Sequence, residues 1–365
     1  MNVLIVSQRN VPRGLGRQLA YGSWYEAEAT LAATAEAHFL MLEHNIDRQS
    51  IRIRRLLGRQ LRQRVKPGLS LPPSRRRIGI DGRYDVAVIL PFTPWELPLL
   101  EELGGLHHVA DRVVVWYPEF WPSEAADQRL RHEPWHLVDD IFVSIHPAVR
   151  VLAEALGRPV HYLPMAADVP AFCPQSLCAE RPIDVMNIGR RIPELHDALL
   201  DWARRTNHFY LYDTFTVAAM IDPLAHRRDL GQRYQRSAVS ICSYPKHDLH
   251  QVAEGRRIIP QRLWEGLASG TTMIGMPPDE DLQRLAVGEV VVEPLPEDPH
   301  QGVAAIEKLL DSDANEIRRR NLELALRRHD WAHRWRQLFE VLELPVPLGT
   351  TERIAYLARM ADTLE

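Results

Sequence analysis

The chain has 365 residues, more than one ordinary hydrophobic core accommodates and enough for two domains. Hydrophobic residues make up 45% and charged residues 25% of it, which is typical of a globular protein in water. A net charge of -4 excludes a general electrostatic attraction to nucleic acid, and no uninterrupted apolar run is long enough to span a bilayer.

The first residues and the cysteines bear on the cellular location. MNVLIVS reads as a strand, and the N-terminal region has no basic segment followed by a long apolar one, so we expect no signal peptide. Cys173, Cys178 and Cys242 match neither a disulfide framework nor a paired zinc-binding motif. These features predict a cytoplasmic protein.

Short apolar segments alternate with helical patterns along the chain. This alternation predicts an α/β fold, with parallel sheets covered by helices on both faces. The segments form two sets, separated by the Pro-bearing and aperiodic stretch 168–182. Strands are predicted at 3–7, 86–91, 113–117, 140–144 and 160–164, then at 184–188, 209–212, 239–243, 272–275 and 289–292. Helices are predicted at 20–37, 148–156, 195–205 and 303–310, and amphipathic helices at 316–342 and 352–364.

The loop after the first predicted strand, NVPRGLGRQLAYG, contains Gly14 and Gly16. Glycines in such a loop let the phosphates of a ligand, or an acceptor, approach the backbone closely. The full dinucleotide-binding fingerprint is absent, so the position alone makes Gly16 a candidate binding residue.

A basic segment follows the first predicted helix. Residues 48–80 contain no acidic residue, and RQSIRIRRLLGRQLRQRVK mixes arginine with isoleucine and leucine. Two interpretations stay open for residues 48–77: a solvated helix with a mobile loop, or a surface that meets anionic lipid head groups or an anionic acceptor. Nucleic acid is not expected as a partner, because no aromatic residues are interleaved for base stacking.

Aromatic residues follow the third predicted strand, in VVVWYPEFWPSE. Their faces suit sugar rings or apolar acceptor tails, although such residues equally form a core. Glu119 lies among them and is a candidate general base, and His146 is a second candidate catalytic residue. The aromatic residues are Trp116, Tyr117, Phe120 and Trp121.

A polar loop follows the predicted strand at 239–243. Tyr244 and Lys246 in this loop are candidate contacts for a ligand, whereas His247 and His250 lack a second pair of zinc ligands. Asp279, with the two acidic residues after it, reads as the N-cap and first turn of a helix. The sequence therefore predicts no obligatory metal ion.

The segment RLWEGLASGTTMIG, residues 262–275, resembles the donor-site helix of group 1 glycosyltransferases, which typically reads R-x-x-E-A-x-A-x-G-x-x-V-I. DVMNIGRR at 184–191 is similar to the first strand and loop of the donor domain in that family. The segments 144–172 and 327–342 are similar to its last acceptor-domain segment and its closing helix. The resemblance covers residues 140–342 and is poor before them.

This resemblance implies the GT-B fold, in which two Rossmann-like domains face each other across a cleft. Residues 1–167 would form the acceptor-binding domain and 183–342 the domain that binds a nucleotide-diphosphate sugar, joined by the linker 168–182. Residues 343–365 would form a helix that crosses back and packs on the first domain.

The resemblance also assigns roles to residues. Glu265 would accept hydrogen bonds from the ribose hydroxyls, for which an acceptor-only carboxylate is suited, unless it is a first-turn glutamate favoured by the helix dipole. Arg190 would help to hold the diphosphate. Gly270 and Thr271 would let the ligand approach the backbone, or Gly270 is only a helix C-cap.

Two positions depart from the family pattern. Arg257 stands where the family often has a second glutamate, and Leu195 stands near its usual diphosphate-binding lysine. Arg191, Arg256 or Arg257 would then take over from that lysine.

The expected function is transfer of a sugar from a nucleotide-diphosphate sugar to a glycan, lipid-linked or small-molecule acceptor. A nucleotide-sugar epimerase or hydrolase, and a non-catalytic scaffold or regulatory partner, remain alternatives.

Overall fold

The computed structural model describes residues 1–9, 19–42, 48–65, 80, 82–214, 222–247 and 250–364, and it divides into two compact units. Unit 1 comprises Met1–Pro164, Gln251–Gly255 and Trp335–Thr350. Unit 2 comprises Met165–His250, Arg256–Arg334 and Thr351–Glu365. Each unit is built around one parallel sheet.

The unit 1 sheet has the strand order β2-β1-β3-β4-β5-β6, with every pairing parallel. Its central strands are rich in valine and isoleucine and are buried on both faces, as expected for a parallel sheet between two layers of helices. The strands are β1 (Asn2–Ser7), β2 (Glu36–Met41), β3 (Val86–Ile89), β4 (Val113–Tyr117), β5 (Asp140–Val143) and β6 (His161–Tyr162).

Strand β2 differs from the sequence-based prediction. The Ala- and Glu-rich pattern predicted one helix over 20–37, but the helix α1 (Gly22–Thr34) ends earlier and Ala35 is extended. Residues 36–41 then pair with β1 as an edge strand, so tertiary pairing overrides local helix propensity there. The other helices of unit 1 are α2 (Arg48–Arg64), α3 (Pro98–Glu102), α4 (Pro122–Ala125) and α5 (His146–Leu156), with 3-10 turns η2 (Leu19–Tyr21), η3 (Pro94–Glu96), η4 (Gln128–His132) and η5 (Trp135–Leu137).

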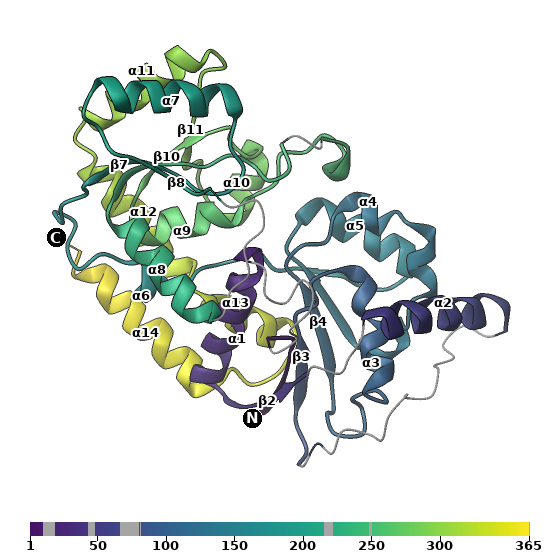
Figure 1. The fold of residues 1–365 in the computed structure, drawn as a ribbon. Coiled ribbons are helices and arrows are strands. Elements are labelled where there is room, and N and C mark those ends of the chain that lie inside the picture. The colour runs from purple at the N-terminus through teal and green to yellow at the C-terminus, as the bar shows by residue number, and fades with distance from the viewer. Residues whose placement is uncertain are drawn as a thin grey trace. The chain divides into compact units, whose positions relative to one another are not determined.

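The unit 2 sheet has the order β11-β10-β9-β7-β8, again with parallel pairings. Helices α7 (Pro193–Arg205) and α11 (Pro299–Leu310) cover one face; α8 (Pro223–Gln235), α9 (Gln261–Ser269) and α12 (Asn315–Arg328) cover the other (Figure 1). The strands are β7 (Ile183–Asn187), β8 (Tyr210–Tyr212), β9 (Ser237–Ile241), β10 (Thr272–Gly275) and β11 (Val292–Pro294), and the remaining short elements are α6 (Val169–Phe172), η6 (His250–Ala253) and α10 (Glu280–Ala286).

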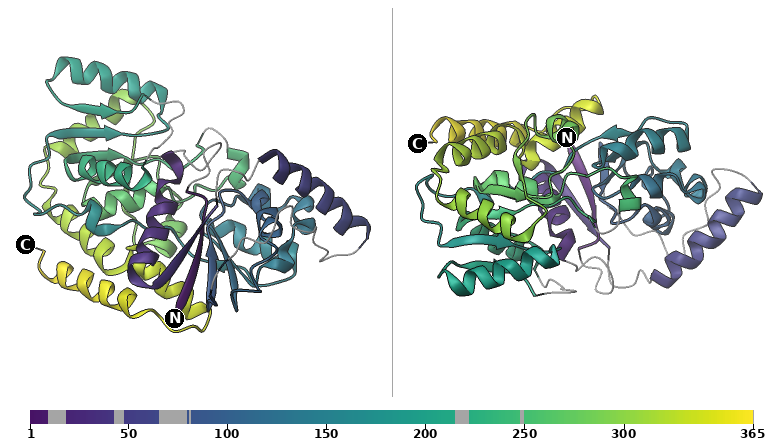
Figure 2. Two further views of the ribbon diagram at one scale, coloured as in Figure 1. Left: turned by 60° about the horizontal axis from the view of Figure 1, so that its bottom comes forward. Right: turned by 90° about the horizontal axis from the view of Figure 1, so that it is seen from above.

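The C-terminal helices pass between the units along the chain. Helix α13 (Trp331–Val341) begins in unit 2 and ends in unit 1, and α14 (Leu348–Asp362) begins in unit 1 and continues in unit 2. Figure 2 shows α14 in yellow along one side of unit 2, where Leu357 and Ala361 join the core formed with α9 and α12. Arg353 of α14 bonds Asp168 and Asp330 at 2.6 and 2.7 Å.

The observed division differs from the expected boundaries at both ends of the second domain. The chain passes into unit 2 at Met165, and the predicted linker 168–182 lies inside that unit and contains α6. Residues 351–365, expected on the first domain, belong to unit 2. The predicted α/β class with two parallel sheets is confirmed. Within the described part of the chain, no helix is both long and apolar enough to cross a membrane.

Candidate functional site

The unit 2 sheet reverses its strand order between β7 and β9. The chain leaves β7 towards β8 on one side of the sheet, and β9 lies on its other side. Open α/β sheets bind ligands at such a switch point, beyond the carboxyl ends of the strands. A cavity of about 570 Å³ lies there, lined by residues 190–194 after β7, by Tyr244 and His247 after β9 and by Met276 after β10.

The loop after β7 brings two consecutive arginines to this cavity. Gly189 has a φ of 86°, a left-handed value that glycine adopts without strain, and its N–H donates to Asp213 Oδ2 at 2.9 Å. Arg191 forms an ion pair with the same carboxylate at 3.1 Å. Arg190 is exposed and lines the cavity. Arg190 therefore lies at the wall of this cavity, and its role in holding a diphosphate stays a prediction.

The loop after β9 supplies the opposite wall. Tyr244 is held by a backbone bond to Met276 at 2.9 Å and is mostly buried, and its ring packs edge-on against His247. Burial raises the pKa of Tyr244, so its hydroxyl stays protonated and able to donate at neutral pH. Lys246, a candidate ligand contact from the sequence, lies between these two residues with a positive φ of 54°.

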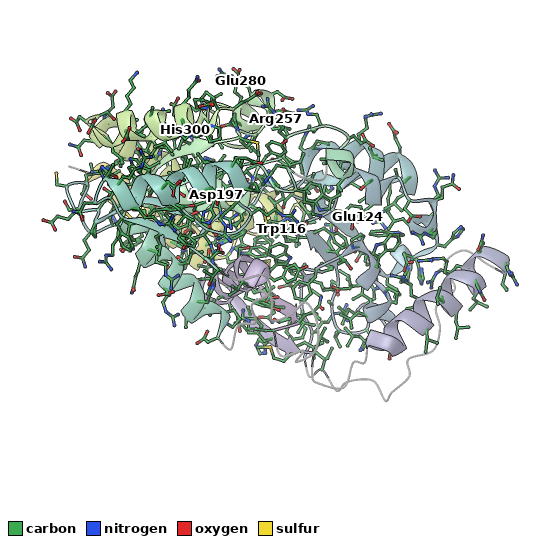
Figure 3. The ribbon with its side chains drawn as sticks, turned by 45° about the horizontal axis from the view of Figure 1, so that its top comes forward. Trp116, Glu124, Asp197, Arg257, Glu280 and His300 are labelled. Atoms are coloured by element: carbon green, nitrogen blue, oxygen red, sulfur yellow. The ribbon has the colours of Figure 1, made fainter. Side chains whose placement is uncertain are left out.

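Arg256 and Arg257 are engaged by the acidic residues at the start of α10. Arg256 bonds Asp279 and Asp281 at 2.6 Å each, and Arg257 bonds Asp279 at 2.9 Å. Figure 3 labels Arg257 and, in the first turn of α10, Glu280. Partial burial acts to raise the pKa of Asp279, but the hydrogen bonds from both arginines outweigh it and lower the pKa. The predicted role of Arg257 in holding a ligand would therefore compete with this ion pair.

Glu265 lies on α9, beyond the first turn, so the helix dipole does not explain it. Its side chain is 5% exposed and forms an ion pair with Arg227 of α8, whose side chain is 6% exposed. Arg227 engages Oε1, and no described residue donates a hydrogen bond to Oε2. The sequence did not reveal Arg227 as a site residue, because a partner 38 positions away leaves no local pattern.

Gly270 and Thr271 lie at the other edge of the sheet, where α9 ends and β10 begins. Gly270 has a φ of 67° and ends α9 as a left-handed C-cap. Thr271 is fully buried, and its Oγ1 accepts a hydrogen bond from Arg181 at 3.1 Å. These two residues are not at the carboxyl edge, and their observed roles are helix termination and packing.

In unit 1, the aromatic residues at the end of β4 and just after it form core rather than an open face. Trp116, Tyr117, Phe120 and Trp121 are all at most 3% exposed. Glu119 is partly exposed and accepts a 2.7 Å hydrogen bond from the Trp121 indole. His146 is exposed at the start of α5 and packs edge-on against Tyr162. Both candidate catalytic residues therefore follow strands at the carboxyl edge of the unit 1 sheet.

The switch point of the unit 1 sheet lies between β1 and β3. There Ser7 and Arg9 bond the buried Glu28 at 2.6 and 3.1 Å, and Gln8 bonds Glu96 at 3.0 Å. Burial raises the pKa of Glu28 to about 7, against the opposing effect of Arg9 and Ser7. Gly16, the predicted binding residue in the loop after β1, lies outside the described residues, and no pattern in the sequence indicated this carboxylate cluster.

Two further observations concern the predicted lysine position and metal ligands. Leu195, near the position of the family lysine, is 2% exposed and belongs to the core. Among the described residues, no group of three or more histidine, cysteine, aspartate and glutamate side chains is arranged to hold a metal ion.

Comparison with known proteins supports the resemblance seen in the sequence. Residues 190–340 match the family model described as "Glycosyl transferase-like", which confirms the similarity to glycosyltransferases over that part of the chain. No curated protein sequence matches the chain.

Solved structures resemble the chain over nearly its whole length. Anabaena HepE in complex with UDP-glucose superposes with a TM-score of 0.51 at 10% identity, covering 94% of this chain and 99% of HepE. The Candida albicans trehalose-6-phosphate phosphatase N-terminal domain gives 0.46 at 12% identity, with coverages of 98% and 96%. AviGT4, a glycosyltransferase involved in avilamycin A biosynthesis, gives 0.43 at 12% identity, with coverages of 99% and 98%. The likeness to HepE confirms the predicted GT-B fold class.

Proposed function

We propose that this protein is a glycosyltransferase that moves a sugar from a nucleotide-diphosphate sugar to an acceptor in glycan or glycoconjugate biosynthesis. The observation that carries the proposal is the cavity at the unit 2 switch point, lined by Arg190 and Arg191 next to Gly189. The family match over residues 190–340 and the HepE complex with UDP-glucose support the same reading.

Groups in and near the cavity suit the donor side of such a transfer. Departure of the nucleoside diphosphate develops negative charge on phosphate oxygens, which positioned cations stabilise. Arg190, which lines the cavity, and Lys246 of the loop after β9 would bind those oxygens, and Tyr244 would donate from its neutral hydroxyl. Glu265 would accept from a ribose hydroxyl through Oε2 while Arg227 holds Oε1.

The acceptor is proposed to bind unit 1. Glu119 and His146 stand after β4 and β5 and would act as base or orienting group, without an obligatory metal ion. The nucleotide, the sugar and the acceptor class are left to experiment.

The test is thermal unfolding of the purified protein with UDP, GDP, ADP, TDP and their common sugars, with and without magnesium. A ligand that binds only the folded state must raise the unfolding midpoint. We expect one nucleotide series to raise it clearly, equally well without magnesium. If none of these compounds shifts the midpoint, the chain is better regarded as a non-catalytic partner protein.

A second assay separates transfer from the other enzymatic alternatives. Release of nucleoside diphosphate from the selected donor is measured with and without a panel of glycan, lipid-linked and small-molecule acceptors. A transferase releases it faster with one acceptor class. Release or donor conversion that no acceptor accelerates indicates a hydrolase or epimerase instead.

We further propose that the protein works in the cytoplasm and touches an anionic membrane surface through the segment 48–77, of which residues 48–65 are described. Helix α2 turns charged groups inward, since Arg59 and Arg62 bond Glu133 and Glu101 at 2.6 and 2.5 Å. It leaves Ile53, Leu56 and Leu57 about half exposed, and Figure 2 shows it extending beyond the other helices of unit 1.

An apolar face within a segment that lacks acidic residues suits the interface of an anionic bilayer. Co-sedimentation with vesicles of neutral lipid, and with vesicles containing phosphatidylglycerol, tests this contact. We expect binding to the anionic vesicles that is lost in the double variant Leu56→Glu, Leu57→Glu. Equal sedimentation of the parent and the double variant would show that this face of α2 does not bind the membrane.

A further inference from the structure

The basic residues around the carboxyl edge of unit 2 differ in how far their charges are already neutralised. Arg191 is paired with Asp213, Arg227 with Glu265, and both Arg256 and Arg257 with Asp279. A cation that already has a carboxylate partner must give up that partner, or share it, to bind a phosphate. The side chain best suited to take an incoming phosphate is therefore one without an acidic partner.

Arg262, the second residue of α9, fits this description. No described residue forms a hydrogen bond or an ion pair with it, and its Nε is buried without a partner. The residue as a whole is half-buried. A buried N–H without a partner costs free energy, which a bound group that accepts from it would recover.

The position of Arg262 is fixed by the glycine that precedes the arginine pair. A Cβ on Gly189 would lie only 2.1 Å from Nη2 of Arg262, so the guanidinium occupies the space that a side chain at 189 would fill. Its charge also acts on the thiol of Cys242, the first residue after β9. Arg262 therefore stands at the switch point, between the ends of β7 and β9, beside the loop that carries Arg190.

We propose that Arg262 binds the diphosphate of the nucleotide donor and replaces the basic group that Leu195 does not supply. The proposal rests on the proposed function and adds one residue to it. Its guanidinium reaches the loop from α9, the helix that also carries Glu265 one turn later. A single helix would then bind the ribose and the diphosphate of the same nucleotide, and the planar fork of arginine suits phosphate oxygens.

The test compares a nucleoside with its diphosphate in the full-length protein. Binding of UDP and of uridine is measured by calorimetry for the parent, Arg262→Ala and Arg262→Lys, with GDP and guanosine or ADP and adenosine in their place if thermal unfolding selects them. We expect Arg262→Ala to weaken UDP binding roughly 10- to 100-fold and to leave uridine binding within about twofold, since charged hydrogen bonds to the diphosphate alone are lost. Arg262→Lys is expected to bind UDP with an affinity between those of the parent and Arg262→Ala.

Arg284→Ala is the matched control, because Arg284 is an exposed arginine of unit 2 whose ion pair, among the described residues, is with Glu280 one turn away. It is expected to bind both compounds as the parent does. If Arg262→Ala binds UDP as tightly as the parent, Arg262 does not bind the diphosphate and only packs against the loop after β7. The same conclusion follows if the affinities of this variant for UDP and uridine fall by the same factor. A parent protein that binds no nucleotide at all overturns the proposed function itself, which separates the two failures.

Discussion

At the scale of single residues, the buried pair of Arg227 and Glu265 combines a structural and a binding role. Both side chains are almost fully buried, so each charge is compensated mainly by the other. The sequence located the glutamate through the residues around it. It was unable to locate its partner, because α8 and α9 meet only in the folded unit.

Glu265→Ala is expected to have two separable effects. Stability should fall by about 3 to 5 kcal/mol, since Arg227 is left buried without a counter-charge. Nucleoside binding should weaken by about 1 to 3 kcal/mol through the lost ribose hydrogen bonds. Urea unfolding and calorimetric titration with uridine measure the two quantities.

The double variant Arg227→Met, Glu265→Leu serves as the control for that experiment. It should recover most of the lost stability, because no charge remains buried, but it should not recover nucleoside binding. If it binds uridine like the parent, Glu265 is a structural residue only.

Glu28 gives the stability of unit 1 a dependence on pH. Its pKa is about 7 in the folded protein against an ordinary value of 4.5, chiefly because of burial. Between these two pH values the folded state holds more protons than the unfolded state. The free energy of unfolding should therefore fall as pH rises through this window, by about 3 kcal/mol in total, and stay level above it.

The variant Glu28→Gln keeps a hydrogen-bonding group beside Ser7 and Arg9 but does not titrate. Urea unfolding of the parent from pH 4.5 to 8 should show the decline, and this variant should lose it. Glu36→Gln, at an exposed glutamate of the same unit, should keep the decline. An unchanged slope in Glu28→Gln would mean that Glu28 is ionised throughout.

At the scale of elements, the prediction from sequence succeeded where one strand or helix carries its own pattern. The valine-rich strands and the amphipathic α7 and α11 were found, because periodicity reports burial directly. The edge strand β2 was missed, since its first residues, Glu36 and Ala37, continue the helical composition of α1 and only pairing with β1 makes it a strand. The Gly270 C-cap interpretation agrees with the observed left-handed turn.

The end of α9 offers a matched pair of glycine substitutions. Gly270 and Gly157 both end helices at φ values of 67° and 64°, but only at Gly270 would a Cβ crowd Leu322, at 2.9 Å. Gly157→Ala should cost about 1 to 2 kcal/mol from backbone strain alone, and Gly270→Ala clearly more. Urea unfolding of both variants measures the difference. Equal losses of stability would show that Leu322 or α12 moves to make room for the extra methyl group.

At the scale of the whole molecule, the units are compact but neither is a continuous piece of chain. The sequence predicted the two sheets, because apolar segments mark each sheet, and the resemblance implied that the C-terminal helices cross back to the first domain. It did not imply that α14 then returns to unit 2. Both helices are amphipathic, and amphipathicity shows that a helix is covered without showing by which core.

Leu357 tests which core α14 completes. It is fully buried in the unit 2 core, so Leu357→Ala should cost about 2 to 5 kcal/mol there. In scanning calorimetry, this variant should lower the midpoint temperature of the unfolding transition whose midpoint UDP raises. Tyr356→Ala, at a neighbouring side chain that is 49% exposed, should change it little. If Leu357→Ala lowers only a transition that does not respond to UDP, the helix stabilises unit 1 instead.

The crossing of the C-terminal helices limits how such a protein can be recombined. Residues 335–350 belong to unit 1 although they come after nearly all of unit 2 in the gene, and 251–255 belong to it as well. A single crossover near residue 164 would therefore exchange only the first of the three segments of unit 1. The segments 251–255 and 335–350 would remain parental and would have to pack against a foreign first segment. A chimera that exchanges acceptor specificity between relatives should carry all three segments together, and homologous exchange at one breakpoint should yield mostly misfolded products.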